Sequence, residues 1–288
     1  MKLTKQNQAV FTLDIEANNR HNQSIMLASD IHYDSVTCDL KRFTEHLQLA
    51  NELKAPVLIA GDFFDAMQGH DDPRRSPEEL KAEYKVSHYF DAIVLDASKF
   101  IQQFSDVPAW IFGLGNHETS VMKKISTNLC ERLAYDLRLH GHKAEAAGYW
   151  GYLRVTFKYK KGGDAPSRMI YWHHGTSSNA IVTRGTIQTN RQGVYLHDAD
   201  VVLNGHNHHA YCLPIQAEKV NQTTLEPYTK TVWYLRTPGY KKSATDSKQV
   251  YGYGAEKHRA PTPRGCIFLD MTYHKAVDIS MEVRQKIG

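Results

Sequence analysis

Five short segments of the sequence place acidic, carboxamide and imidazole side chains within a few residues of one another. Ligands of these three kinds together suit borderline divalent cations such as Mn²⁺, Fe²⁺ or Zn²⁺, and the lack of cysteine in the segments argues against a structural zinc site. The sequence therefore predicts a metal centre assembled from distant parts of the chain. In chain order the segments are Asp30-Ile31-His32, Gly61-Asp62, Gly115-Asn116-His117-Glu118, His173-His174-Gly175 and Gly205-His206-Asn207-His208.

Two of the segments carry two ligands separated by a single residue. In an extended chain such residues point to the same side, so Asp30 and His32 can reach one ion, and so can His206 and His208. In three of the segments a glycine directly precedes a ligand, which suits a chain that leaves a strand sharply and brings its backbone close to the site.

Each segment directly follows a short apolar run that is typical of a β-strand. Helical patterns over residues 39–53 and 78–104 lie between the early runs, so the first half alternates strand and helix, as in a parallel α/β core. The carboxyl ends of such strands meet at one crevice, where we expect the ligands to converge. The five predicted strands cover residues 25–29, 57–60, 109–114, 168–172 and 200–204.

After Gly148 the predicted strands follow one another more closely and imply a second sheet. Two sheets packed face to face, with helices on the outside, give an α/β fold that is a four-layered α/β/β/α sandwich with two packed mixed sheets. No linker, repeat or low-complexity tract divides the chain, so we expect a single domain over residues 1–288. The additional strands are expected over residues 152–159, 231–236, 266–270 and 277–283.

The composition is that of a packed soluble protein, with 41% hydrophobic and 23% charged residues among 288. No apolar run approaches the roughly 20 residues that cross a bilayer, and Asp14 and Glu16 interrupt any signal peptide. We therefore expect a cytoplasmic protein that binds no membrane and needs no obligate protein partner. The four cysteines form no CxxC pair, which favours buried free thiols. The net charge of +4 is compatible with a polyanionic substrate without requiring one.

In this order the segments resemble the pattern DxH, GDxxD, GNH followed by D or E, H, and GHxH of calcineurin-like metallophosphoesterases, from Asp30 to His208. The resemblance implies the four-layered sandwich and two divalent metal ions, with Mn²⁺ expected first and Fe, Zn, Ni or Mg as alternatives. It also implies that Asp62 bridges the two metals. The first metal would be held by Asp30, His32, Asp62 and His208, and the second would be completed by Asn116, His173 and His206.

The resemblance leaves open which of two adjacent histidines is the ligand. Strand alternation allows only one of His173 and His174 to face the metals. His173 is favoured, because related proteins place the ligand two positions before the residue that closes this turn, here Gly175. His174 would then support the metal ligands from behind.

The resemblance also implies the catalytic roles. Two metals about 3.5 to 4 Å apart activate a shared water, so a metal-bridging hydroxide is the expected nucleophile, held in place by Asp62. His117 would donate a proton to the leaving oxygen or stabilise the charged transition state. Glu118 would orient His117, and Asp65 would accept the second N–H of a ligand imidazole.

Three segments near residues 65–77, 179–193 and 236–265 are candidate substrate loops. The second contains Arg184 and Arg191, and the third alternates basic residues with tyrosines, which suits a flexible nucleic acid or an ordinary polar loop. We therefore expect hydrolysis of a phosphodiester in a nucleic acid or nucleotide. The alternatives are a phosphomonoesterase acting on a small phosphate or phosphoprotein, and a metal-binding scaffold without turnover.

The stretches GDFFDAMQG, HHG and RGTIQTNRQGVYLHDADVVLNGHNHH also resemble uncharacterised metallophosphoesterases encoded by bacteriophages. That resemblance implies a role in viral nucleic-acid metabolism or in disarming a nucleotide-based host defence.

Overall fold

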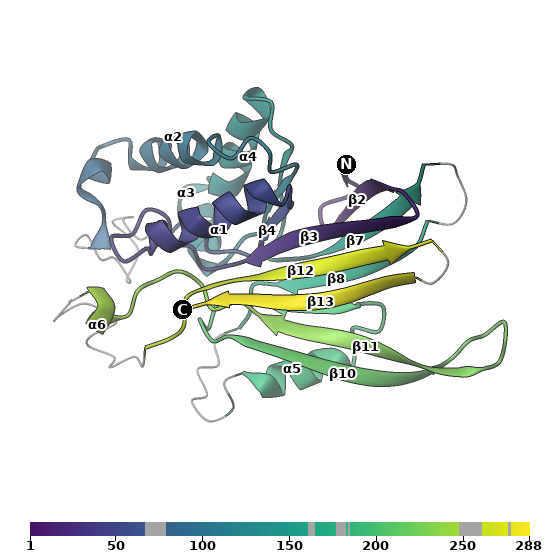
Figure 1. Ribbon diagram of the computed structural model, residues 1–288. Helices are drawn as coiled ribbons and strands as arrows, with labels where there is room; N and C mark the ends of the chain where they lie inside the picture. Colours follow the sequence, from purple (N-terminus) through teal and green to yellow (C-terminus); the bar gives the residue numbers. More distant parts are fainter. Residues whose placement is uncertain (67–78, 161–164, 177–182, 184, 248–260, 276–277) are drawn as a thin grey trace.

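The computed structural model describes residues 1–66, 79–160, 165–176, 183, 185–247, 261–275 and 278–288. Its strands form two mixed sheets that pack face to face (Figure 1). The six-stranded sheet has the order β13-β12-β3-β4-β5-β6. Strands β3 to β6 are parallel to one another. Strand β12 pairs antiparallel with β3 on one side and with β13 on the other. These strands are β3 (Arg20–Ala28), β4 (Val57–Ile59), β5 (Trp110–Phe112), β6 (Ala144–Ala146), β12 (Gly265–His274) and β13 (Asp278–Ile287).

The seven-stranded sheet has the order β1-β2-β7-β8-β9-β11-β10 and mixes both strand directions. Its β8 and β9 are parallel, so their carboxyl ends lie at the same edge of the sheet. Its strands are β1 (Lys2–Lys5), β2 (Val10–Ala17), β7 (Trp150–Tyr159), β8 (Ser167–His173), β9 (Val201–Asn204), β10 (Tyr211–Val220) and β11 (Pro227–Arg236).

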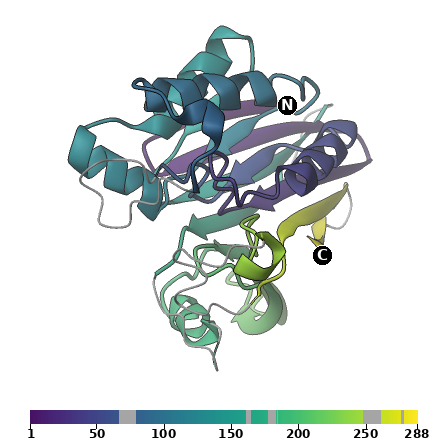
Figure 2. The same cartoon turned by 90° about the vertical axis from the view of Figure 1, so that its left-hand side faces the viewer.

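Helices cover the outer faces of the two sheets. Figures 1 and 2 show α1 to α4 on the side of the six-stranded sheet and α5 on the opposite side of the sandwich. The predicted four-layered α/β/β/α sandwich is therefore confirmed. The helices are α1 (Leu40–Glu52), the 3₁₀ turn η2 (Ala82–Tyr84), α2 (Tyr89–Ile101), α3 (Asn116–Ile125), α4 (Leu129–Leu139), α5 (Thr186–Gly193) and α6 (Ala244–Ser247).

The alternation of side chains along β3 explains why both faces of the six-stranded sheet are buried. Ile25 and Leu27 pack into the core between the sheets, whereas Met26 and Ala28 pack against the helices. A strand that is buried on both faces reads as a continuous apolar run, which is why this strand was predictable. At the end of the run the chain enters the first ligand segment, with Asp30 two residues beyond the end of β3.

Two segments differ from the sequence-based expectation. The helix expected over residues 78–104 begins only at Tyr89 and is preceded by the short turn η2. Part of the loop expected over residues 179–193 is the helix α5. The four cysteines are free, as predicted; Cys38, Cys130 and Cys266 are also buried as expected, whereas Cys212 is half-buried. Among the described residues, no helix is long and apolar enough to span a membrane.

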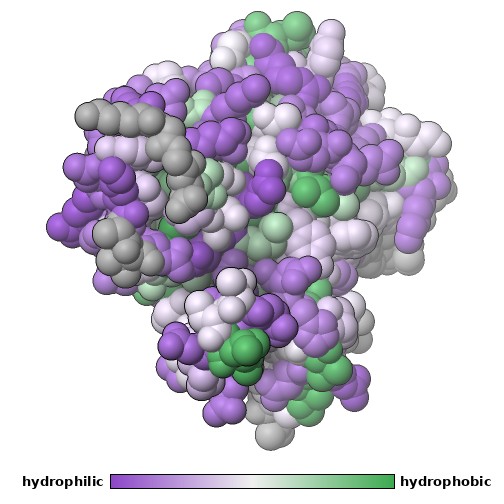
Figure 3. All heavy atoms as spheres, turned by 90° about the vertical axis from the view of Figure 1, so that its right-hand side faces the viewer, coloured by the Kyte–Doolittle hydropathy of each residue, from purple (hydrophilic) through white to green (hydrophobic). Residues whose placement is uncertain are grey.

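The hairpin of β10 and β11 projects from the sandwich away from the ligand segments (Figure 1). Figure 3 looks onto this side of the molecule, where hydrophilic residues predominate and hydrophobic ones gather at the lower end. The exposed apolar side chains of the hairpin include Ile215, Val220 and Leu225.

Candidate metal centre

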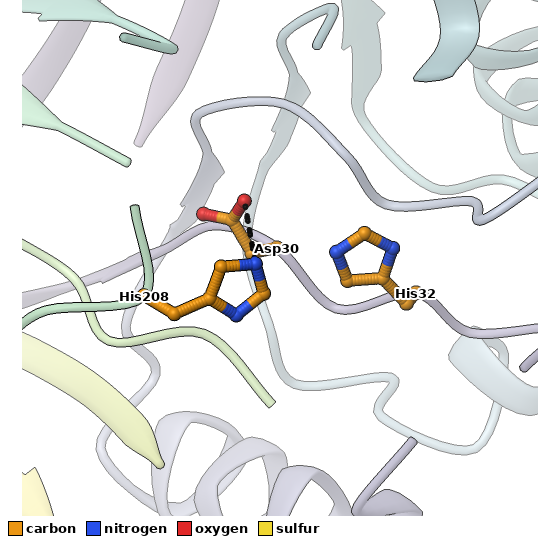
Figure 4. A group of neighbouring side chains, drawn as sticks. All are labelled: Asp30, His32 and His208. Carbon is orange, nitrogen blue, oxygen red and sulfur yellow. Dashed lines mark ion pairs between the residues drawn. The ribbon is translucent and has the colours of Figure 1, made fainter. Parts of the chain in front are cut away.

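The first ligand group brings together Asp30 and His32, from the loop after β3, and His208, from the loop after β9. One ligand atom from each lies within 4.8 Å of the others. His208 Nε2 is 3.6 Å from Asp30 Oδ1, the contact marked in Figure 4. Asp30 and His32 are buried, and His208 is partly exposed. The predicted pairing of these three side chains is therefore present in the structure.

The second ligand group consists of Asp62, His174 and His206, whose ligand atoms also lie within 4.8 Å of one another. His174 Nε2 is 3.1 Å from Asp62 Oδ2 and 3.2 Å from Asn116 Oδ1. Four side chains from four separate loops therefore converge here. Asp62 falls into this group, and its bridging role toward the first group stays a prediction.

The backbone at five of these ligands adopts the left-handed conformation that is uncommon outside glycine. The values of φ lie between 51° and 72° at Asp30, His32, Asp62, His206 and His208. Each such residue costs on the order of 1 kcal/mol or more and persists only where surrounding contacts enforce it. Backbone hydrogen bonds between the two loops supply that enforcement, from Asp30 N to the Gly61 carbonyl at 3.0 Å and from His32 N to the Asp62 carbonyl at 3.1 Å. Strain concentrated at one cluster of polar side chains marks a functional site.

Glu118 is fully buried beneath the loops that carry the second group. Its carboxylate accepts hydrogen bonds from the backbone N–H groups of Gly115 at 2.8 Å, Phe64 at 3.0 Å and Asp62 at 3.2 Å. Burial, followed by the charge of Asp62, raises the pKa of Glu118 to about 7. The structure thus shows Glu118 fixing the backbone of two ligand loops, whereas the sequence had predicted that it orients the His117 ring.

The ring of His117 is oriented by a backbone carbonyl. Its Nδ1 lies 2.5 Å from the carbonyl oxygen of Asp65 and therefore donates a proton to it. Its Nε2 is 3.8 Å from Asp62 Oδ2, and its centroid lies 4.8 Å from that of His32. Burial lowers the pKa of His117, but the charges of Asp62 and Asp65 outweigh this effect and raise it. His117 therefore lies beside both groups with one nitrogen already occupied.

Asp65 makes the contact that was expected of it. Its Oδ1 lies 2.8 Å from Nδ1 of His32, which leaves Nε2 of that imidazole for a metal. Lys241 approaches the same carboxylate at 3.4 Å and binds Glu79 at 2.8 Å. Because the carboxylate is engaged in this way, the further grouping of His32, Asp65 and His117 is a hydrogen-bonded support for the site and no third metal group.

Asp34 supports Asp65 in turn and is not among the residues predicted for the site. Its buried carboxylate accepts the backbone N–H groups of Asp65 at 2.6 Å and Ala66 at 3.0 Å, and the hydroxyl of Tyr89. The spacing Asp30, His32, Asp34 continues the same alternation, and this signal could have identified it.

The two adjacent histidines take different places. His174 is fully buried, and its Nδ1 lies 2.8 Å from the Ala60 carbonyl while Nε2 faces Asp62. His173 ends β8, is partly exposed, and accepts the Gly175 N–H at its Nδ1 at 2.9 Å. The structure therefore brings His174, and not the favoured His173, into the ligand group. Only one of the two faces the group, as strand alternation requires.

The predicted substrate residues are only partly placed. Arg184 lies outside the described residues, and Arg191 is exposed on α5. In the segment 236–265, several basic residues already have structural partners: Arg236 is buried with its guanidinium 5.0 Å from the Tyr211 ring, and Arg264 binds Asp39 at 2.8 Å. These contacts favour the ordinary structural reading for the described part of this segment. Residues 67–77, 179–182 and 248–260 of the three candidate loops lie outside the residues that the structure describes.

The electrostatics of the second group favour a bound cation. Burial opposes ionisation of Asp62, but the neighbouring His174 and His117 more than offset it, so the pKa of Asp62 lies well below its ordinary value. Conversely, burial lowers the pKa of His174, and Asp62 outweighs this effect and raises it to about 10. Positive charge beside Asp62 therefore stabilises this buried group, and a divalent cation would supply such a charge.

Two buried atoms of the first group test whether a metal fits there. Within the described part of the chain, Asp30 Oδ1 and His32 Nε2 are buried and make no hydrogen bond. Leaving such atoms unsatisfied costs about 1–3 kcal/mol each, and a metal ligated by oxygen and nitrogen removes this cost. The residues present therefore fit a divalent cation of the Mn²⁺, Fe²⁺ or Zn²⁺ type.

A family model decides the classification, because the model for calcineurin-like phosphoesterases matches residues 24–210. The chain belongs to the calcineurin-like phosphoesterase family. The matched region contains every residue of both ligand groups. Membership in this metallophosphoesterase family supports metal-dependent phosphoester hydrolysis and the binding of a phosphate-ester substrate.

Comparison with solved structures gives distant likenesses only. Vps29 of Chaetomium thermophilum is 8% identical with a TM-score of 0.38, and the match covers 92% of this chain and 96% of Vps29. GAP50 of Plasmodium, described as an anchor in the inner membrane complex, is 10% identical with a TM-score of 0.40, covering 93% and 89%. A predicted phosphoesterase of Streptococcus pneumoniae is 11% identical with a TM-score of 0.29, covering 92% and 99%. No curated protein matches the chain, and the resemblance to bacteriophage proteins stays a prediction.

Proposed function

We propose that the protein is a dinuclear-metal-dependent phosphoesterase that hydrolyses a phosphodiester of a nucleic acid or nucleotide. The observation that carries this proposal is the convergence of two ligand groups at one cluster of loops. Two divalent cations bound there would supply positive charge for the phosphate oxygens and an activated water for attack on phosphorus. Their ligands would be Asp30, His32 and His208 in one group, and Asp62, Asn116, His174 and His206 in the other.

His117 is the residue proposed to act on the substrate itself. Its Nδ1 is fixed by the Asp65 carbonyl, so Nε2 is the nitrogen left to meet a phosphate ester. In the protonated form, Nε2 can donate a proton to the leaving oxygen or stabilise the charge that develops in the transition state. Glu118 acts indirectly, because its carboxylate binds the backbone of the two loops that carry Asp62 and His117.

The basic side chains near the site already have protein partners, which supports a phosphodiester substrate over a phosphomonoester. A phosphate monoester carries about −1.5 to −2 charge at neutral pH, whereas a diester carries a single charge and needs fewer cationic partners. In the part of the chain that the structure describes, Lys241 already binds Glu79, and Arg236 lies buried against Tyr211. Both side chains therefore stabilise the fold near the site, which leaves less positive charge for a phosphate monoester.

Hydrolysis of bis-p-nitrophenyl phosphate beside p-nitrophenyl phosphate, with Mn²⁺ added or chelated away, tests the proposal. We expect Mn²⁺-dependent release from the diester and a much weaker reaction with the monoester. A preference for the monoester would make the protein a phosphomonoesterase. If neither compound is hydrolysed while metal is bound, the enzymatic reading fails and the fold acts as a metal-binding scaffold.

A further inference from the structure

A continuous row of aromatic rings leads away from the second ligand group. The His206 ring meets that of His174 at a centroid distance of 5.2 Å, and His174 meets Tyr149 at 5.3 Å. Tyr149 in turn contacts His173 at 5.3 Å. All three contacts are edge-to-face, the arrangement that aromatic quadrupoles favour. The row therefore connects the ligand group to His173 at the outer face of the seven-stranded sheet.

The row continues onto exposed surface through Trp150. Trp150 is the antiparallel partner of His173, and side chains of such partners lie about 4.5–5.5 Å apart at Cβ. Its ring lies 6.3 Å from that of Tyr152, which lies 5.0 Å from that of Tyr171. Trp150 is 47% exposed, whereas two of the other three tryptophans, Trp110 and Trp172, are fully buried. Trp150, Tyr152 and Tyr171 therefore form one aromatic surface that adjoins His173.

Two further residues complete this face. Tyr195, which follows α5, is 62% exposed. Leu196, the next residue in the chain, belongs to the same hydrophobic cluster as Tyr171 and Tyr152, which places Tyr195 at the border of this aromatic surface. Arg154 is exposed on the same face of β7 as Trp150 and Tyr152, since side chains of alternate residues share a face. Among the described residues Arg154 has no ion-pair partner, so its charge remains available.

We propose that Trp150, flanked by Tyr152 and Tyr195, is a base-stacking platform for a single-stranded nucleic acid whose reacting phosphate lies at the ligand groups. This inference rests on the proposed function and adds the binding subsite. Exposed rings stack on any base, and a nearby arginine can bind the backbone phosphate that follows the stacked base. Because Trp150 is the strand partner of His173, and the His173 ring meets that of Tyr149 beside His174, a strand leaving the site over this edge reaches Trp150 within a short span. The occupant is therefore a flexible strand and not a duplex, whose bases are stacked internally.

Binding of a short fluorescently labelled oligothymidylate, measured by anisotropy, tests the platform. The His117→Ala background with Mn²⁺ present keeps the strand uncleaved. Trp150→Ala should weaken binding roughly fivefold to a hundredfold, the range of base–aromatic stacking, and Trp150→Phe should restore most of it. An oligonucleotide of the same length without bases should bind the unaltered platform as weakly as the base-bearing strand binds Trp150→Ala. Tyr135→Ala is the matched control, because Tyr135 is a 59% exposed aromatic residue on α4.

Hydrolysis of bis-p-nitrophenyl phosphate separates failure of the platform from failure of the proposed function. Trp150 belongs to neither ligand group, so Trp150→Ala should hydrolyse this small diester at the rate of the unaltered protein. Unchanged oligonucleotide binding with normal hydrolysis of the small diester would overturn the platform alone. A loss of self-association or of protein binding, with oligonucleotide binding intact, would identify the face as a protein interface and contradict the inference. Absence of diester hydrolysis in the unaltered protein would count against the proposed function instead.

Discussion

Replacing Asp34 by asparagine should separate the support of the site from its chemistry. The Asp34 carboxylate accepts the backbone N–H groups of Asp65 and Ala66 and the Tyr89 hydroxyl. It thereby fixes the turn whose Asp65 carboxylate binds His32 and whose carbonyl orients His117. Asp34→Asn keeps the shape but turns one acceptor into a donor that faces a backbone N–H.

The magnitude follows from these three hydrogen bonds. Losing one bond to a charged acceptor costs about 1.5–3 kcal/mol of unfolding free energy. Burial, and then the charge of Asp65, raises the pKa of Asp34, so the neutral amide also avoids an unfavourable buried charge. The expected loss of unfolding free energy is therefore at the lower end, about 2 kcal/mol. Displacement of the His117 ring should lower kcat about tenfold, a part of the roughly 10² to 10⁴ that proton transfer contributes, with KM little changed.

Denaturant titration and the kinetics of bis-p-nitrophenyl phosphate hydrolysis measure the two effects. Asp96→Asn is the matched control, because the Asp96 carboxylate likewise accepts tyrosine hydroxyls, in this case those of Tyr33 and Tyr84, but within the described part of the chain makes no hydrogen bond or ion pair with Asp65. It should lower stability and leave kcat unchanged. If Asp34→Asn loses stability with kcat intact, or if both variants lower kcat equally, the reasoning about the Asp65 turn is refuted.

Three further predictions concern other parts of the molecule. Asp62→Asn should abolish metal binding and turnover together, whereas His117→Ala should keep its bound metal and lose most of the rate. Mass spectrometry of the metal content and kinetics of diester hydrolysis check both variants. Retained metal in Asp62→Asn would contradict the ligand assignment. Burial, and then Arg42, lowers the pKa of His46 from 6.5 to about 4, so the unfolded chain binds more protons than the fold between these values. The unfolding free energy should therefore fall as the pH falls through this window, and His46→Gln should flatten that slope in denaturant titrations; an unchanged slope would show that other groups cause it. Phe157 is fully buried between the sheets. Phe157→Ala should therefore cost about 3–5 kcal/mol of unfolding free energy, while the folded variant keeps its kcat for the diester. A loss of kcat without a loss of stability would contradict this structural role.

The strands next to the ligands were predictable because local pattern and burial agree there. Residues 57–60 form a short apolar run that ends in Gly61, and the structure buries that run completely. The strand β2 was missed, although Phe11, Leu13 and Ile15 alternate with less buried neighbours, because the polar N-terminal composition hides a strand of period two.

The differences from the sequence-based expectations involve side-chain contacts that the local sequence does not reveal. The helix expected over residues 78–104 begins only at Tyr89, and Tyr84 before it is held by a contact with Asp96 that no local pattern reveals. The preference for His173 over His174 rested on distance from Gly175, whereas the contacts that distinguish the two rings come from Asp62 and Asn116.

The same reason limits what the sequence says of the substrate loops. Lys241 stands in a basic and aromatic segment that suits nucleic acid, yet Glu79 and Asp65, far away in the chain, engage its charge. Basic residues in a loop are therefore weak predictors of phosphate binding until their acidic neighbours are known. Trp150, by contrast, carried no motif and is notable only because the fold leaves it exposed beside the site.

Anomalous diffraction from crystals of the protein soaked in Mn²⁺ tests the central claim most directly. We predict two anomalous peaks, one within the group of Asp30, His32 and His208 and one within the group of Asp62, Asn116, His174 and His206. A single peak would contradict the dinuclear centre, and a peak at His173 in place of His174 would contradict the ligand assignment. The absence of any peak at these loops would contradict the metal-dependent mechanism as a whole.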